Sequence, residues 1–159
     1  MNNNYSLEGK IIETNRRYSA ANKFFEQGVG LGLTSYNQLI TISSVALGFL
    51  FSIKTEVIGN GLDLQGQKAF FFYFTAFFFI ATIVTAIRRN YHAGYELVNL
   101  SRRFASKADM MWDGSGSEKH KIAILKQKKA NNKRKLYSKL TRISFTGGIL
   151  SLGYLIIIL

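Results

Sequence analysis

Three stretches of the chain are almost purely hydrophobic, and the segments between them are rich in polar and charged residues. The hydrophobic runs cover residues 36–53, 69–87 and 143–159. A membrane-spanning helix needs about 20 mainly apolar residues, within a range of roughly 17–25. The Phe, Ile and Val residues of the second run favour insertion by roughly 3–7 kcal/mol. The pattern predicts an all-α integral membrane protein with three transmembrane helices.

The hydrophobic runs and the polar residues around them divide the chain into six segments. We predict an N-terminal cytoplasmic amphipathic helix in 1–35, a first span at 36–57, an external loop at 58–68, a second span at 69–89, basic cytoplasmic helices in 90–142 and a third span at 143–159. The last run is at the short limit for a span, so an interfacial helix is the alternative there.

Lys and Arg are distributed unevenly among the polar segments. The net charge is +12, and residues 88–142 hold fifteen cations against four anions, whereas residues 54–68 hold two of each. Cationic segments remain on the cytoplasmic side of a membrane. We therefore expect the N-terminus and the long basic region on the cytoplasmic side of the membrane, and the short loop outside.

The polar segments also have apolar residues at a helical period. Within residues 7–27, four of them recur at heptad-like spacing, which predicts one apolar helix face: Ile11, Tyr18, Ala21 and Phe25. No helix-breaking residue follows Arg89, so the second span is predicted to continue into a long cytoplasmic helix. We expect Trp112, near its end, to lie in the core of a cytoplasmic helical bundle. The Gly- and Ser-rich residues 113–117 then break the helix.

The composition disfavours enzyme chemistry. The chain has no Cys, and its imidazoles are limited to His92 and His120. Cys-based metal sites are therefore excluded, and a metal held by several His ligands of one chain is disfavoured. The interiors of the spans have no ionisable residue, which disfavours coupled transport. We predict a protein that is not an enzyme and needs neither a metal nor a cofactor.

Small residues recur at close intervals in the first and third spans. They are Ser44, Gly48 and Ser52 in the first, and Gly147, Gly148 and Ser151 in the third. Such rows let helix backbones approach closely. Packing within one chain and association between subunits both explain them.

A weakly polar stripe follows one face of the second span. Its members are Thr75, Thr82, Ala86 and Arg89. This stripe fits the lining of a narrow pore with a ring of Arg at its inner mouth. Packing of the Thr hydroxyls against a neighbouring helix explains it equally well.

The densest cluster of charge lies at residues 126–135. Its six cations are Lys126, Lys128, Lys129, Lys133, Arg134 and Lys135, and Arg102 and Arg103 are candidates to join them. One interpretation is topogenic charge that also attracts anionic lipid, at about 1 kcal/mol per cation near the surface. The sharper hypothesis is a site for a phosphate-rich ligand such as an oligonucleotide or a cyclic nucleotide.

Two stretches, NRRYSAANKFF at residues 15–25 and RRNYHAGYELVNLSRRF at residues 88–104, are similar to the SLATT group of small bacterial membrane proteins. The resemblance covers roughly residues 7–112. It implies an oligomeric, pore-forming effector of anti-phage defence that harms its own cell on infection. It also implies a nucleotide ligand made by a partner nucleotidyltransferase. The family has two spans, so the basic helix and third hydrophobic run at 118–159 depart from it.

The combined prediction is a homo-oligomer, a tetramer for example, that forms a channel in the lipid bilayer and is gated by an anionic nucleotide or oligonucleotide at the basic region. A non-conducting scaffold that binds anionic lipid or a partner protein is the main alternative. A phage holin ranks last, because the cytoplasmic helices are longer than a holin needs.

Overall fold

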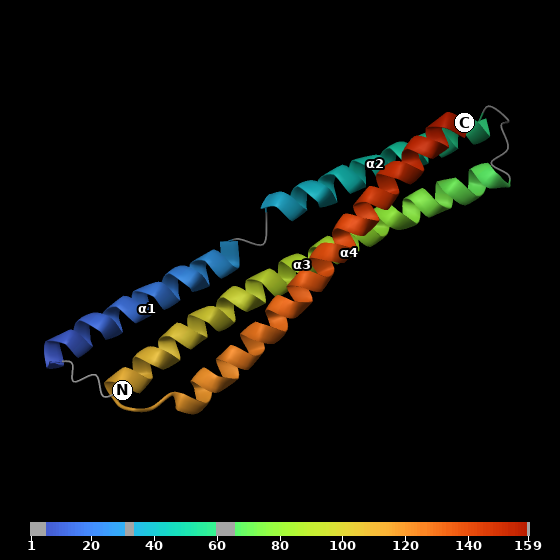
Figure 1. The fold of residues 1–159 in the computed structure, drawn as a ribbon. Coiled ribbons are helices and arrows are strands. Elements are labelled where there is room, and N and C mark those ends of the chain that lie inside the picture. The colour runs from blue at the N-terminus through green and yellow to red at the C-terminus, as the bar shows by residue number, and fades with distance from the viewer. Residues whose placement is uncertain (1–5, 31–33, 60–65, 159) are drawn as a thin grey trace. The chain divides into compact units, whose positions relative to one another are not determined.

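The computed structural model describes residues 6–30, 34–59 and 66–158. Within these ranges the chain forms four helices, α1 (Leu7–Gly30), α2 (Thr34–Gly59), α3 (Gln67–Trp112) and α4 (Ser117–Ile158), labelled in Figure 1. Three of them, α2, α3 and α4, are long and apolar enough to cross a membrane. The predicted all-α fold with three candidate spans is therefore confirmed.

The predicted segments can be compared with these helices. Helix α2 continues to Gly59, two residues past the predicted end of the first span, and α3 begins at Gln67. Most of the predicted external loop, residues 60–65, lies outside the described residues, as do residues 1–5 and 31–33 of the N-terminal segment and Leu159 of the third span. The second span continues without interruption to Trp112, and α4 joins the basic segment and the third hydrophobic run in one helix.

The chain divides into two compact units. One comprises residues 1–32 and 91–134, and the other comprises residues 33–90 and 135–159. We call the first the polar unit and the second the membrane unit, because all three hydrophobic runs fall within the second. Helices α3 and α4 contribute residues to both units.

The core of the membrane unit joins α2, α3 and α4. Its buried residues are Leu50 from α2, Phe72, Ala76 and Phe79 from α3, and Leu155 from α4. Helix α4 approaches α3 closely through Gly147 and Gly148, where an added Cβ would lie 2.9 Å from the Phe78 ring and 3.1 Å from the Phe79 ring. These glycines leave room for aromatic rings between the two backbones.

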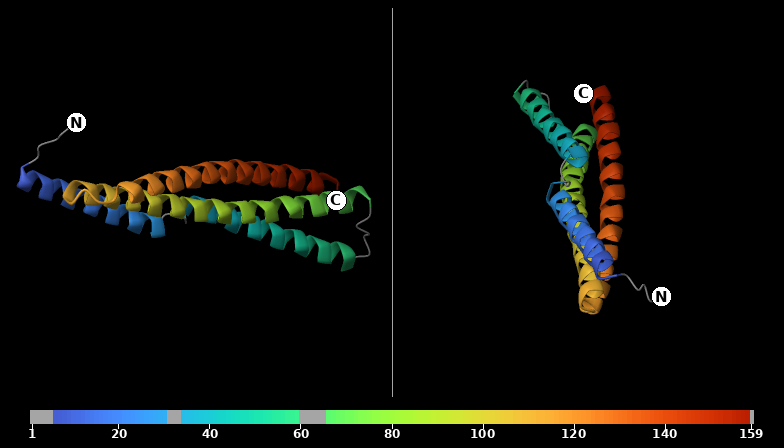
Figure 2. Two further views of the ribbon diagram at one scale, coloured as in Figure 1. Left: turned by 90° about the horizontal axis from the view of Figure 1, so that it is seen from below. Right: turned by 90° about the vertical axis from the view of Figure 1, so that its left-hand side faces the viewer.

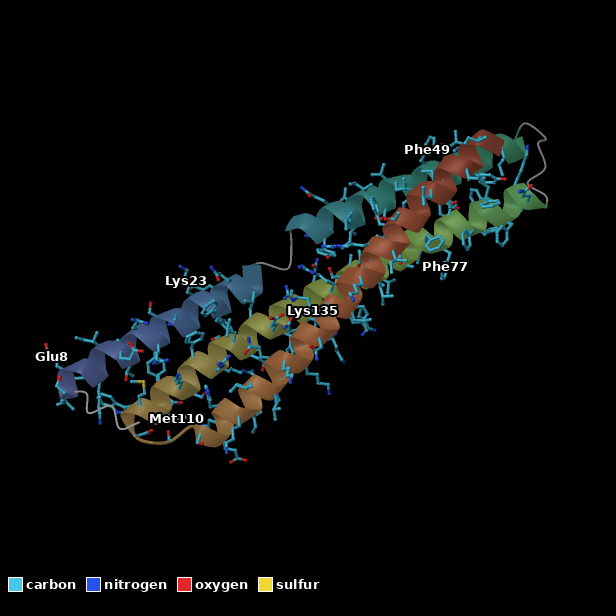
Figure 3. All side chains as sticks on the ribbon, viewed as in Figure 1. Glu8, Lys23, Phe49, Phe77, Met110 and Lys135 are labelled. Atoms are coloured by element: carbon cyan, nitrogen blue, oxygen red, sulfur yellow. The ribbon has the colours of Figure 1, made fainter. Side chains whose placement is uncertain are left out.

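The outer surface of the membrane unit is covered with large apolar side chains. Phe49 and Phe77, labelled in Figure 3, are 52% and 64% exposed. The same outward placement is found for Val45, Phe70, Ile80 and Leu150. A surface of this composition matches a hydrocarbon environment, because water would have to solvate a large contiguous apolar area.

Polar and aromatic groups gather at the two ends of the spans. At one end, the Arg89 guanidinium lies 4.0 Å from the centre of the Tyr36 ring, and Asn90 donates a hydrogen bond to Asn37. At the other end, Gln67 donates to the Tyr154 hydroxyl at 3.1 Å. Aromatic and cationic residues are typical of membrane–water interfaces. The α3 segment between Gln67 and Arg89 measures roughly 33 Å at 1.5 Å per residue, which suits a bilayer core of about 30 Å.

In the polar unit, α1 packs on α3. The rings of Phe24 and Phe104 stack with their centres 5.2 Å apart, and the Tyr18 hydroxyl donates a hydrogen bond to the Asp109 carboxylate. The views of Figure 2 agree that residues 91–112 of α3 also run alongside residues 117–134 of α4.

Two predictions about the polar unit need correction. Ala21 of the predicted face of α1 is buried, together with Thr14, whereas the other three predicted residues, Ile11, Tyr18 and Phe25, are 40%, 41% and 51% exposed. Trp112 is 59% exposed instead of lying in a core, because α3 ends at this residue and the chain turns away. The first prediction relied on apolar spacing, and the second also on the distance of Trp112 from the span; neither indicates which side of a helix meets a neighbour.

Candidate ligand site in the polar unit

A cavity of about 320 Å³ lies between α3 and α4 within the polar unit. Its polar lining comes from Asn99, Arg102, Ser106 and Asp109 of α3 and from Lys119 and Lys126 of α4, with Ala105, Ile122 and Ala123 as apolar wall. The spacings of three, four and seven residues place each set on one face of its helix.

The turn between the two helices sets their close approach. Gly114 and Gly116 adopt φ values of +76° and +87°, a region that disfavours other residues. The Asp113 carboxylate accepts a hydrogen bond from the Ser115 backbone N–H at 2.8 Å. A Cβ on Gly116 would lie 2.7 Å from the Ser106 carbonyl oxygen. Glycine is therefore required where α4 doubles back onto α3.

Hydrogen bonds in this turn also affect an acid. The Ser115 side chain and backbone N–H, both bonded to Asp113, hold the pKa of that carboxyl below its ordinary value. Donors that favour the ionised carboxylate disfavour its protonation. These hydrogen bonds therefore favour the ionised form of Asp113.

His120 connects the first turn of α4 to α3. Its Nδ1 atom lies 3.1 Å from the Arg103 carbonyl oxygen and 3.3 Å from the Ser106 hydroxyl oxygen. Because a carbonyl oxygen can only accept, Nδ1 must carry a proton and donate to it. This contact fixes the start of α4 beside the cavity.

The charges that line the cavity favour an anion. Arg102, Lys119 and Lys126 supply three positive charges against the single carboxylate of Asp109. The Tyr18 hydroxyl donates to that carboxylate, and this bond raises the pKa of Tyr18 because only the protonated phenol can donate. An anionic group in the cavity would meet an excess of two positive charges.

Two residues of the predicted ligand set, Arg102 and Lys126, line this cavity together. The remaining cations of the set are placed elsewhere. Five of them are exposed and do not line the cavity: Arg103, Lys128, Lys129, Lys133 and Lys135, the last of which is labelled in Figure 3. The Nε atom of Arg134 lies 2.8 Å from a carboxylate oxygen of Glu96, so its charge is balanced within the chain.

Sequence reasoning missed Asn99, Asp109 and Lys119 as lining residues. The signal that could have found them is their register: Asn99, Arg102, Ser106 and Asp109 share one face of α3. Lys119 and Lys126 lie seven residues apart on α4, directly after the tight turn. Charge density drew attention to residues 126–135 instead.

The predicted pore stripe is buried within the chain. Thr75, Thr82 and Ala86 are fully buried, and the Thr75 and Ser151 hydroxyls are hydrogen-bonded at 2.6 Å. The prediction that they line a pore does not hold for the single chain, because other parts of the chain cover them. Arg89 lies over the Tyr36 ring at the end of the spans. The alternative interpretation, in which the Thr hydroxyls pack against a neighbouring helix, describes this face of α3.

The two rows of small residues differ in their surroundings. Gly147 and Gly148 lie against aromatic rings of α3, and Ser151 is buried beside Thr75. Ser44, Gly48 and Ser52 of α2 are exposed, and nothing lies within 4 Å of a Cβ added to Gly48. The small residues of the third span therefore pack within the chain, whereas those of the first span face outward.

The described residues contain no group of three or more His, Cys, Asp or Glu side chains suited to a metal ion. Comparison of the chain with protein families, with curated proteins and with solved structures found no match. The candidate site is therefore defined by its geometry alone, as a basic cavity of small-molecule size between two long helices.

Proposed function

We propose that the protein is a homo-oligomeric, channel-like membrane effector that responds to an anionic nucleotide bound in the basic cavity. The observation that carries this proposal is that the two helices lining the cavity, α3 and α4, are also the closely packed pair of the membrane unit. A ligand shifts an equilibrium only if it binds two states unequally. A ligand held between α3 and α4 favours one spacing of these helices, and each continues unbroken into the membrane unit.

The conducting path is proposed to lie between copies of the chain. The Thr75 hydroxyl contacts Ser151 of α4, and both Thr75 and Thr82 are fully buried, so these two residues offer no aqueous lining within one copy. Helix α2 carries the exposed row Ser44, Gly48 and Ser52 on the side opposite the buried Leu50. Small and hydroxyl-bearing residues support both close helix association and a weakly polar lining.

The resemblance to SLATT proteins supports a biological setting for this activity. In that setting a nucleotidyltransferase partner makes the ligand during phage infection, and the effector permeabilises the bacterial inner membrane from within. The excess of Lys and Arg in residues 88–142 supports a cytoplasmic position for the cavity. The ligand would then reach it directly from the cytoplasm.

The gating proposal is tested by ion flux from liposomes that contain the purified full chain. Flux is measured before and after addition of adenosine 5′-monophosphate, a cyclic dinucleotide or a hexanucleotide. We expect at least one of them to change the flux, and the double variant Arg102→Gln/Lys126→Gln to need roughly tenfold more of it. Because both cations are exposed, each contact contributes only about 0.7 kcal/mol, and losing two of them amounts to about tenfold.

A matched control removes the same two charges from the same two helices. The variant Arg103→Gln/Lys128→Gln changes exposed cations that do not line the cavity. It should respond like the wild type. Liposomes that stay ion-tight with each of the three ligands would exclude the channel. An equal loss of ligand response in both variants would mean that the response depends on overall positive charge and not on the cavity.

The proposed association through α2 has its own test. Gly48→Leu adds bulk where the single chain has open space, so folding should be retained while contacts between copies are blocked. We expect chemical cross-linking in membranes to yield fewer oligomers. Gly153→Leu, which also adds bulk at an open and exposed position, is the control. Unchanged cross-linking of Gly48→Leu would exclude this face as the interface.

A non-conducting scaffold is the second candidate, and two observations favour it. The Ser44 and Thr41 hydroxyls bond to the carbonyl oxygens of Ile40 and Asn37 of their own helix, which lowers the polarity of the α2 surface. The exposed lysines between residues 128 and 135 suit anionic lipid. Replacing the six cations of residues 126–135 by Gln separates the two functions. Loss of vesicle binding with no change in flux favours the scaffold.

A further inference from the structure

Asn99 is the most buried polar residue that lines the cavity, with no exposed surface. Its Nδ2 atom donates a hydrogen bond to the Tyr95 carbonyl oxygen at 2.7 Å. This bond fixes the orientation of the amide, because the reverse orientation would bring two acceptors together. The Oδ1 atom is buried and meets no hydrogen-bond donor in the described part of the chain. An unpaired buried acceptor is costly, so a donor on a ligand would relieve that cost.

The other groups in the lining are complementary to a phosphorylated molecule with hydroxyl groups. Arg102 and Lys126 are exposed cations from opposite walls, and cations of this kind bind phosphate oxygens. The Asp109 carboxylate is an acceptor suited to sugar hydroxyls, a pairing used at other nucleotide sites. Ile122 supplies an apolar surface for a flat ring.

We propose that the cavity binds a single nucleoside monophosphate. Its phosphate would lie between Arg102 and Lys126, and Asn99 Oδ1, which is covered in the ligand-free chain, would become accessible and accept a hydrogen bond from an N–H group of the base. The volume of about 320 Å³ is at the lower end of the range for small-molecule sites, which suits one nucleotide and not a strand. The inference rests on the proposed function only in taking the ligand to be a nucleotide, and it narrows that ligand to a mononucleotide.

Binding to the full chain in detergent, measured by titration calorimetry, tests this proposal. The probes are adenosine 5′-monophosphate, ribose 5-phosphate, inorganic phosphate and a hexanucleotide. The monophosphate should bind at least tenfold more tightly than ribose 5-phosphate and inorganic phosphate. Asn99→Leu, which removes the acceptor at similar volume, should weaken its binding about tenfold and leave phosphate binding unchanged.

Two further measurements separate a ligand contact from a structural role of Asn99. Without ligand, Asn99→Leu should melt near the wild type, because the lost hydrogen bond from Nδ2 to the Tyr95 carbonyl oxygen is offset by removal of a buried acceptor that has no donor. Ala105→Leu fills the cavity from its apolar wall and should abolish binding without touching any polar group. A lower melting temperature of Asn99→Leu with unchanged affinity would overturn the proposal.

The remaining outcomes distinguish this inference from the gating proposal. Equal affinity for phosphate and for the monophosphate would show that only cations bind, and would overturn the mononucleotide site. A hexanucleotide that binds more tightly than the monophosphate and is unaffected by Asn99→Leu would also overturn it. Monophosphate binding that passes these tests without any change in flux would uphold the site and overturn gating by this ligand.

Discussion

The two units of the chain connect their helices through different chemistry. In the membrane unit, the hydrogen bonds between helices join neutral groups, as in Thr75 with Ser151 and Thr141 with Thr85. In the polar unit, ionised side chains also join helices, as in Arg134 with Glu96 and Tyr18 with Asp109, beside neutral contacts such as the stacked Phe24 and Phe104 rings. Unpaired charge is expensive in hydrocarbon, whereas hydroxyl groups satisfy one another or their own backbone. The solvent of each unit thus restricts how its helices are joined.

The difference extends to how closely the helices approach. In the membrane unit, glycines bring α4 against aromatic rings of α3, and little space is left between them. In the polar unit, the same two helices leave a cavity with a charged rim. Packing in lipid depends on close contact, because no hydrophobic effect draws apolar helices together there. We therefore expect steric changes to dominate in the membrane unit and changes of salt or pH to matter in the polar unit.

The largest effect is expected from Gly148→Leu, which breaks the close packing of the membrane unit. Its side chain would collide with the Phe79 ring, which is fully buried and has no room to move. Overpacking of this kind costs about 3 kcal/mol or more. Thermal melting in detergent should show a large loss of stability, whereas Gly153→Leu on the same helix, with open space around it, should melt near the wild type. Similar melting of both variants would contradict the close packing.

The next largest effect is expected in the turn of the polar unit. Gly116→Ala combines a left-handed backbone with a clash against the Ser106 carbonyl oxygen, and should cost about 2–3 kcal/mol. Gly114→Ala has the same backbone strain without the clash and should cost about 1 kcal/mol. Limited proteolysis near residue 116 reports the opening of this turn. Equal sensitivity of the two variants would mean that α4 does not approach α3 closely there.

A smaller pair of effects sharpens the contrast between charged and neutral contacts. Glu96→Gln removes the partner of Arg134 and should cost about 1 kcal/mol at low salt, because both side chains are only partly shielded from water. Thr75→Val removes the hydrogen bond to Ser151 and should cost about 0.6 kcal/mol. High salt should reduce the first loss and leave the second unchanged. Melting curves at two salt concentrations measure both losses. A loss that depends on salt for Thr75→Val but not for Glu96→Gln would contradict the contrast between charged and neutral contacts.

The spans could be predicted from the sequence because three long apolar runs fit only a few structures. Which faces meet could be predicted only as one of two alternatives, because the row of Thr75, Thr82 and Ala86 suits both a pore lining and contact with a neighbouring helix. Local charge density pointed to Lys126 and Arg102, and the cavity contains both. Asn99 gave no signal, because an Asn in a helix usually faces solvent. Its burial depends on the turn at residues 113–116, which brings distant parts of the chain together.

The smallest effect is expected at the hydrogen bond from Tyr18 to Asp109, because Tyr18 is 41% exposed. The bond raises the pKa of Tyr18 above its ordinary value of 10.0. Its contribution to stability is therefore fully present below about pH 10 and is lost as the pH rises through the raised pKa of the folded state. Tyr18→Phe should lower the melting temperature slightly at pH 8, and this difference from the wild type should shrink by pH 11. Tyr91→Phe, at a more exposed tyrosine of the same unit, controls for general alkaline effects. A difference that widens with pH would mean that the bond stabilises the phenolate, and would remove this charged contact from the comparison.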